Sequence, residues 1–201
     1  MMTMIEFPMF SGLRCLMMPY IQGEPGSVPK EYYPYYDIIQ SLYFKKGDIG
    51  FLTIDESVVE QGKPHRGDRS KTDRALHTEA GRHPDKVYAW GGGGWGSSHR
   101  TILDCGVEIL LANNLDDSCA VWDTEHPETS LDGDIGHESW KYPYEEAVMM
   151  KAGEVCKIGI LTPHESLPVK ENTKRQFLRI VSSGVYGRES YFTQNPVLYR
   201  S

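Results

Sequence analysis

Two short motifs in the middle of the chain pair a histidine with an acid two residues later. They are His77-Thr78-Glu79 and His83-Pro84-Asp85. Because alternate residues of a β-strand project from the same face, either pair could offer an imidazole and a carboxylate to one metal ion. Pro84 cannot donate to a strand ladder and fits a turn better. From the residues alone both pairs stay candidates for the metal: His77 with Glu79, and His83 with Asp85.

A third metal ligand is expected at His164, which follows the apolar strand pattern of residues 155–161. The chain between either motif and His164 is long enough for several strands with their loops. A third motif with this spacing, His126-Pro127-Glu128, lies nearer to His164 along the chain and is the least favoured of the three candidate pairs. Two histidines and one carboxylate on one face of a metal form the open site of non-haem iron(II) oxygenases. Such a site leaves positions for a co-substrate and dioxygen.

A second strand after His164 carries Arg175, Phe177 and Arg179 at two-residue spacing, so the three side chains share one face. Two arginines that face inward on a strand are costly unless an anion pairs with them. A dicarboxylate ligand would meet this need, because the arginine fork matches a carboxylate with two parallel hydrogen bonds.

The elements that would position these residues are mostly short strands between turns. A helix is expected between residues 27 and 43, where apolar residues recur at three- and four-residue spacing. A helical turn is expected at 144–150. This pattern predicts a mainly β fold, a β-sandwich or jelly roll with one or two N-terminal helices packed outside. Strands are predicted at residues 13–20, 50–54, 100–103, 107–111, 119–122, 155–161 and 175–181.

Length and composition favour a single domain. The 201 residues would divide into an N-terminal strand-helix-strand support (1–60), a jelly-roll core (73–181) and a C-terminal tail (182–201). The formal net charge of -7 disfavours nucleic acid as the main partner. No apolar run is long enough for a membrane span, and the N-terminus lacks a signal-peptide pattern. We expect a cytoplasmic, non-secreted protein whose four cysteines are reduced.

A loop of four glycines lies between Trp90 and Trp95. It is neither a phosphate-binding loop nor a dinucleotide fingerprint, because the residues that complete those motifs are missing. Its glycines allow close backbone approach, so the loop is a lid over a site or a structural crossing. By position alone, Trp90, Trp95 and Arg74, at the end of the basic loop 66–74, are the expected substrate contacts.

The sequence resembles the iron(II)/2-oxoglutarate-dependent dioxygenases with a double-stranded β-helix core, in particular the prolyl-hydroxylase-like members. The run from Pro163 to Pro168 and the run from Arg175 to Ile180 carry the resemblance. It implies His77, Glu79 and His164 as iron ligands and Arg175, or alternatively Arg179, as the residue that binds the far carboxylate of 2-oxoglutarate. Glu79 stands where the family usually has an aspartate. The chain also resembles virus- or phage-encoded proteins.

The resemblance implies hydroxylation of a C–H bond of a protein side chain or a small molecule, with iron(II) as cofactor and 2-oxoglutarate as co-substrate. A second hypothesis is a non-enzymatic jelly-roll structural or assembly protein, such as a virion component, whose tyrosine-rich and Met-rich segments make homo-oligomer contacts. A third is a cupin-like metal protein that uses further histidines, such as His83 or His99, without an arginine-lined carboxylate site.

Overall fold

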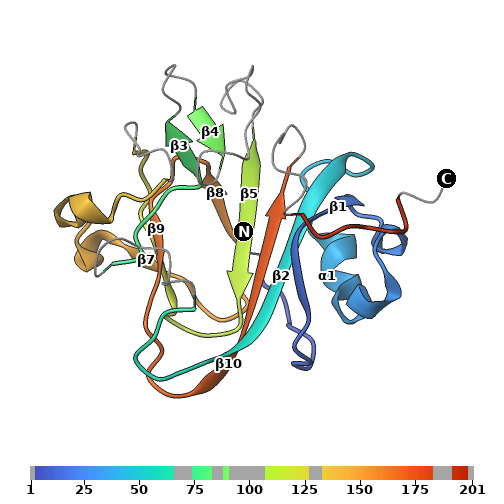
Figure 1. Cartoon of the computed structure of the whole chain (residues 1–201), viewed down its shortest axis with the longest axis horizontal. Coiled ribbons are helices and arrows are strands. Elements are labelled where there is room, and N and C mark those ends of the chain that lie inside the picture. Colours follow the sequence, from blue (N-terminus) through green and yellow to red (C-terminus); the bar gives the residue numbers. More distant parts are fainter. Residues whose placement is uncertain are drawn as a thin grey trace.

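A five-stranded antiparallel sheet forms the centre of the computed structural model (Figure 1). The structure describes residues 3–65, 74–82, 88–90, 107–126, 133–182 and 192–198. The first strand of the chain pairs with the second, and the second pairs with the last, so N-terminal and C-terminal segments lie side by side in this sheet. In spatial order the strands are β1 (Arg14–Ile21), β2 (Ile49–Val59), β10 (Thr173–Val181), β5 (Glu108–Asn113) and β8 (Cys156–Gly159).

A smaller sheet has the order β7 (Val148–Met149), β6 (Cys119–Val121) and β9 (His164–Ser166). Its ladder continues past β9, because His77 forms antiparallel bridges to His164 on one side and to Asp134 on the other. Directly after this segment, β3 (Ala80–Arg82) pairs with β4 (Tyr88–Trp90). The segment that contains the first candidate metal-binding motif therefore extends the small sheet beyond β9.

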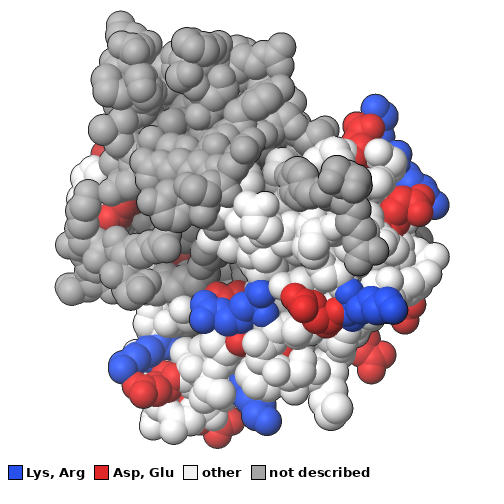
Figure 2. Space-filling view, turned by 45° about the vertical axis from the view of Figure 1, so that its right-hand side comes forward, with Lys and Arg blue, Asp and Glu red and all other residues white. Residues whose placement is uncertain are grey.

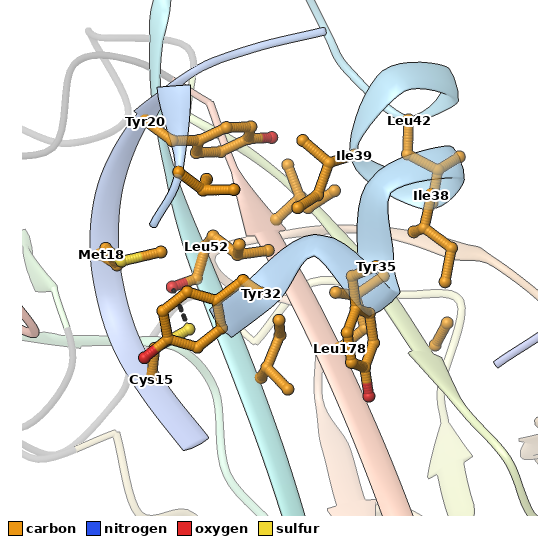
Figure 3. Close-up of a cluster of buried hydrophobic side chains, with 14 residues drawn as sticks. Cys15, Met18, Tyr20, Tyr32, Tyr35, Ile38, Ile39, Leu42, Leu52 and Leu178 are labelled. Carbon is orange, nitrogen blue, oxygen red and sulfur yellow. Dashed lines mark hydrogen bonds between the residues drawn. The ribbon is translucent and has the colours of Figure 1, made fainter. Parts of the chain in front are cut away.

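The N-terminal helices lie on the face of the large sheet that points away from the small sheet (Figure 1). The sequence predicted one helix here, but the structure has three short ones: η1 (Pro25–Ser27), η2 (Lys30–Tyr35) and α1 (Tyr36–Ser41). Pro34 lies inside η2 and has no N–H to donate, so a regular α-helical ladder cannot run through it. Tyr35, Ile39 and Leu178 belong to the buried cluster that joins these helices to the sheet (Figure 3).

Strand β10 separates this helix layer from the space between the two sheets. Leu178 and Ile180 pack in the helix-side cluster, whereas Phe177 and Val181 pack in the cluster between the sheets. By the two-residue period of a strand, Arg175 and Arg179 share the second face. The apolar part of the space between the sheets is filled from β5, β6, β8 and their neighbours, chiefly by Ile109, Leu111, Cys119, Val121, Met150 and Ile158.

Two 3-10 turns cover the outer face of the small sheet: η4 (Gly136–Lys141) and η5 (Tyr144–Glu146). The helical turn predicted at 144–150 is thus only η5, and the chain then enters β7. Leu76, Trp122 and Ile135 are buried beneath these turns.

The fold is mainly β, as predicted, and the strands expected at 13–20, 107–111, 119–122, 155–161 and 175–181 are confirmed with small changes of boundary. The strand expected at 50–54 extends to Val59, and the one at 100–103 lies outside the described residues.

The described cysteines, Cys15, Cys119 and Cys156, are unpaired, as predicted, and Cys105 lies outside the described residues. Burial raises the pKa of Cys15 to about 12 and that of Cys119 to about 11, so both thiols stay protonated at neutral pH.

Acidic and basic side chains alternate over the described surface that Figure 2 shows. Among the described residues, no helix is both long and apolar enough to cross a membrane.

Candidate metal centre

His77, Glu79 and His164 come together between the two sheets. Their ligand atoms all lie within 4.8 Å of one another. The backbone explains this convergence, because His77 and His164 are directly opposed and exchange two N–H···O=C hydrogen bonds of 3.0 and 2.9 Å. Their ring centroids are 4.2 Å apart. Glu79 follows two residues after His77 and so projects from the same face. The three side chains could hold a metal ion.

Each histidine ring is oriented by a backbone carbonyl two residues before it. His77 Nδ1 lies 2.7 Å from the Ala75 carbonyl oxygen, and His164 Nδ1 lies 2.9 Å from that of Thr162. A carbonyl can only accept, so Nδ1 carries the proton and donates it. In the neutral ring, Nε2 is then the nitrogen with a lone pair. A second hydrogen bond of this kind is the usual way in which proteins fix a metal-binding imidazole.

Glu79 is the buried acid of the group, with 7% of its surface exposed. Its Oε1 lies 3.6 Å from His164 Nε2 and accepts a hydrogen bond of 2.6 Å from Arg179 Nη1. Burial alone would raise the pKa of this carboxyl, but Arg179 and the two histidines more than offset it and hold the pKa well below its usual range. Glu79 is therefore ionised and ready to bind a cation, although Arg179 contacts the same oxygen.

Arg175 is buried farther along the same face of β10, with 2% of its surface exposed. Its Nη1 donates to Ser166 Oγ at 2.7 Å and its Nη2 to the Ser118 carbonyl at 3.3 Å. Nε has no hydrogen-bond partner. Burial lowers the pKa of this guanidinium, yet arginine remains charged in proteins. Ser166 lies two residues after His164 on the same face of β9, so the Cα atoms of these two residues are roughly 7 Å apart.

Arg74, predicted to contact substrate, lies instead on the outer side of the small sheet. Its Nε and Nη2 donate to Glu165 Oε2, and its Nη1 donates to the carbonyl oxygens of Ser139 and Tyr142. All three nitrogen groups are thus engaged within the protein. We leave Arg74 out of the candidate site.

Several predicted residues are not placed by the structure. His83, Asp85, Trp95 and His99 lie outside the described residues, and for Trp90 only the backbone of β4 is described. Of the third motif, only His126 is described. It is buried beside the Tyr142 hydroxyl, with its Nδ1 2.5 Å from that oxygen, on the outer side of the small sheet.

Sequence reasoning missed the polar residues that adjoin the two arginines. Ser166 holds Arg175, and its spacing of two residues from His164 was a usable signal. Asp55, Ser57 and His65 come from β2 and the segment after it. Nothing in their local pattern distinguishes them from an ordinary polar strand and loop.

Comparisons with models of protein families, with curated proteins and with solved structures found no match to this chain.

Proposed function

We propose that this protein is an iron(II)- and 2-oxoglutarate-dependent dioxygenase that hydroxylates a C–H bond of its substrate. One observation carries the proposal: His77, Glu79 and His164 converge on one point, and the face of β10 that bears the buried Arg175 and Arg179 lies opposite them. Two histidines and one carboxylate are the donor set of non-haem iron(II) oxygenases. A buried arginine fork is the group that suits a carboxylate of an organic acid.

The order of the strands is consistent with a double-stranded β-helix, or jelly roll. Along the chain, β2 belongs to the large sheet, the His77 segment to the small one, β5 to the large one, and β6 and β7 to the small one. The chain then returns through β8, β9 and β10 to the large, small and large sheets. Such alternation between two facing sheets is the connectivity of a jelly roll.

The donor atoms fit iron(II). Two imidazole nitrogens and one ionised carboxylate oxygen would suit a borderline divalent ion, and the three ligand atoms lie close enough together to share one. The Ala75 and Thr162 carbonyls set the tautomer of both rings. When bound, iron(II) supplies the activation of dioxygen, and oxidative decarboxylation of 2-oxoglutarate to succinate and carbon dioxide supplies the electrons.

Arg175 is the residue that would bind the far carboxylate of 2-oxoglutarate. Its place beside Ser166, roughly two strand residues from His164, leaves a span of about 7 Å, which suits a short dicarboxylate that also contacts the metal. Arg179 is too close to Glu79 for the same role, because its Nη1 is already bonded to the acid ligand. Arg179 instead keeps Glu79 ionised and fixes its position.

An anaerobic titration with iron(II) and 2-oxoglutarate tests the proposal. A visible charge-transfer band is expected in the wild type and should be absent in His164→Ala. Glu165→Gln is the matched control, because this neighbouring side chain points to the opposite face of the small sheet and should leave the band intact. A folded wild type that binds metal without any band would contradict the proposal. A folded wild type that binds no metal at all would favour a non-enzymatic structural or assembly protein.

A further inference from the structure

Tyr142, His126 and Glu138 form a row of polar groups on the outer side of the small sheet. The Tyr142 hydroxyl lies 2.5 Å from His126 Nδ1, and Glu138 Oε2 lies 3.1 Å from His126 Nε2. His126 and Tyr142 are both buried. None of the three belongs to the metal-binding group. A hydroxyl, an imidazole and a carboxylate in this order are the arrangement in which a histidine takes a proton from a hydroxyl.

The charge of Glu138 decides where the protons of this row lie. Lys141 Nζ donates to Glu138 Oε2 at 3.0 Å, and this contact lowers the pKa of the carboxyl, so Glu138 is ionised at neutral pH. His126 Nε2 is within ion-pair distance of the same oxygen, although its N–H is not aligned for a hydrogen bond. A lone pair on Nε2 would be repelled there. In the neutral ring Nε2 therefore carries the proton, and Nδ1 accepts the hydrogen bond of the Tyr142 hydroxyl.

Two other buried hydroxyl contacts of described tyrosines involve carboxylates. Tyr35 donates to Glu56 Oε1 at 2.8 Å. Tyr144 donates to Glu165 Oε1 at 3.2 Å. Near neutral pH an imidazole takes a proton more readily than a carboxylate, because their ordinary pKa values are about 6.5 and 4.3. Loss of one electron turns a phenol O–H into a strong acid, so oxidation is easiest where a good base already accepts that proton. Tyr142 meets this condition best.

Trp122 connects this row to the strand that carries His164. The Trp122 and Tyr142 rings meet edge to face, with their centroids 5.8 Å apart. Trp122 follows the residue of β6 that is directly opposed to His164, so the Cα atoms of Trp122 and His164 are roughly 6 Å apart. The indole N–H donates to the Pro143 carbonyl, which does not take up a proton. An oxidised Trp122 therefore keeps its proton and is readily reduced again by Tyr142.

We propose that Tyr142 is a redox-active tyrosine that gives an electron, through Trp122, to the metal centre when dioxygen is activated there without a substrate. One electron reduces the oxidised metal ion, and the phenolic proton moves to His126 Nδ1. A neutral tyrosyl radical then lies beside an imidazolium that is paired with Glu138. A soluble one-electron reductant such as ascorbate restores the phenol, and His126 returns the proton. The proposal rests on the proposed function, which supplies the oxidant.

Photochemical oxidation of the full chain without metal tests the tyrosine by itself. A ruthenium tris-bipyridine complex, flashed in the presence of an irreversible electron acceptor, supplies the one-electron oxidant, and EPR spectroscopy detects the long-lived radical. We expect a tyrosyl radical in the wild type, its loss in Tyr142→Phe and an unchanged signal in Tyr144→Phe, the matched control from the same aromatic group. His126→Gln still accepts a hydrogen bond but takes no proton, so the radical should form about 100-fold more slowly.

A second measurement connects the tyrosine to the metal centre. The protein loaded with iron(II) and 2-oxoglutarate is mixed with dioxygen without substrate and freeze-quenched. EPR spectroscopy should show the same radical in the wild type and in Tyr144→Phe, and none in Tyr142→Phe.

The outcomes separate this proposal from the proposed function. A photochemical radical that is equally strong in Tyr142→Phe overturns the proposal, and an unchanged rate in His126→Gln overturns the role of His126. A protein that shows the charge-transfer band of bound 2-oxoglutarate but no Tyr142 radical after dioxygen is added also overturns it, while the proposed function stands. If the band itself is absent, the proposed function fails, and the role of Tyr142 toward the metal fails with it.

Discussion

Two arginine–glutamate pairs, each with a buried glutamate, lie on opposite sides of the small sheet. On the inner side, Arg179 Nη1 bonds to Glu79 Oε1 at 2.6 Å. On the outer side, Arg74 Nη2 bonds to Glu165 Oε2 at 2.7 Å. Both glutamates are less than 10% exposed, and Glu165 directly follows a predicted metal ligand. The bond distances and the burial of the two glutamates therefore do not tell the pairs apart.

The surroundings of the two pairs differ. Arg74 uses all its nitrogen groups within the protein and lies against two aromatic rings, 4.3 Å from the centroid of Tyr144 and 5.4 Å from that of Trp122. Tyr144 also donates its hydroxyl to Glu165 at 3.2 Å. Glu79, in contrast, shares Oε1 between Arg179 and a histidine whose ring is held in metal-binding orientation. A saturated pair stabilises the fold, whereas a carboxylate shared with oriented imidazoles indicates a site.

The largest expected effect comes from breaking the outer pair. Arg74→Ala leaves Glu165 as a buried charge without its cation, and we expect the free energy of unfolding to fall by about 3–5 kcal/mol. Mn(II) affinity of the folded protein should be unchanged. Chemical denaturation and a metal titration on the same sample measure the two quantities. A variant of wild-type stability, or one with weakened metal binding, would show that the outer pair is not purely structural.

A third buried carboxylate sharpens the comparison because it is held by neutral donors. Glu56 accepts hydrogen bonds from the backbone N–H groups of 11–13, from the Tyr35 hydroxyl and from Gln176 Nε2. Burial raises its pKa, but these hydrogen bonds more than compensate and the net shift is downward. A lowered folded-state pKa stabilises the protein above the ordinary glutamate value of about 4.5, and this contribution disappears as the pH falls through the folded-state value.

Glu56→Gln should therefore reduce the free energy of unfolding by about 1–3 kcal/mol at pH 7, and the difference from the wild type should shrink below roughly pH 4. Denaturation curves at a series of pH values would measure this. A difference that stays constant with pH would mean that the charge of Glu56 is not what stabilises the fold.

The smallest expected effect concerns Arg179. A divalent ion bound to Glu79 lies close to the Arg179 guanidinium, and at about 5 Å with an effective dielectric constant near 20 their repulsion amounts to several kcal/mol. Removal of this repulsion strengthens Mn(II) binding, whereas loss of the bond that positions Glu79 weakens it. We expect the net result in Arg179→Gln to be about tenfold tighter Mn(II) binding than in the wild type, in the absence of any 2-oxoacid. Titration at pH 8, which favours the ionised carboxylate, would measure this, with Arg74→Gln as the control. Weaker binding would mean that positioning of Glu79 outweighs the repulsion.

The faces on which the residues of the inner pair lie were within reach of the sequence, but the contact between Arg179 and Glu79, which are 100 residues apart, was not. The two-residue period places His77 with Glu79 and Arg175 with Arg179 on common faces, and the strand pattern before His164 predicts where the second histidine enters. These inferences need only local geometry. The assignment of the acid to Glu79 fits the convergence of the three side chains, while the alternative at Asp85 lies outside the described residues.

The outer pair was not within reach, because it depends on contacts between distant segments. Arg74 and Glu165 are 91 residues apart, and the bridge between His77 and His164 places their two segments side by side. For the same reason His65 escaped notice, since its place follows from the crossing of the chain at Pro64 and Pro168. The sequence predicted Arg74 to be a substrate contact at the end of a basic loop. The local pattern around a charged side chain does not show whether a partner from a distant segment is buried beside it.

The most direct test of this account is a titration of the metal-free protein with Mn(II), followed by calorimetry, in the wild type, His77→Ala and Glu165→Gln. We expect one ion per chain in the wild type and no change of affinity in Glu165→Gln. In His77→Ala the affinity should fall by roughly 100-fold or more, because loss of a ligand should cost more than the 10–100-fold loss that follows removal of a residue that only orients a ligand. A wild type that binds no ion, or a His77→Ala variant that binds it equally well, would contradict the claim that the inner side of the small sheet is a metal centre.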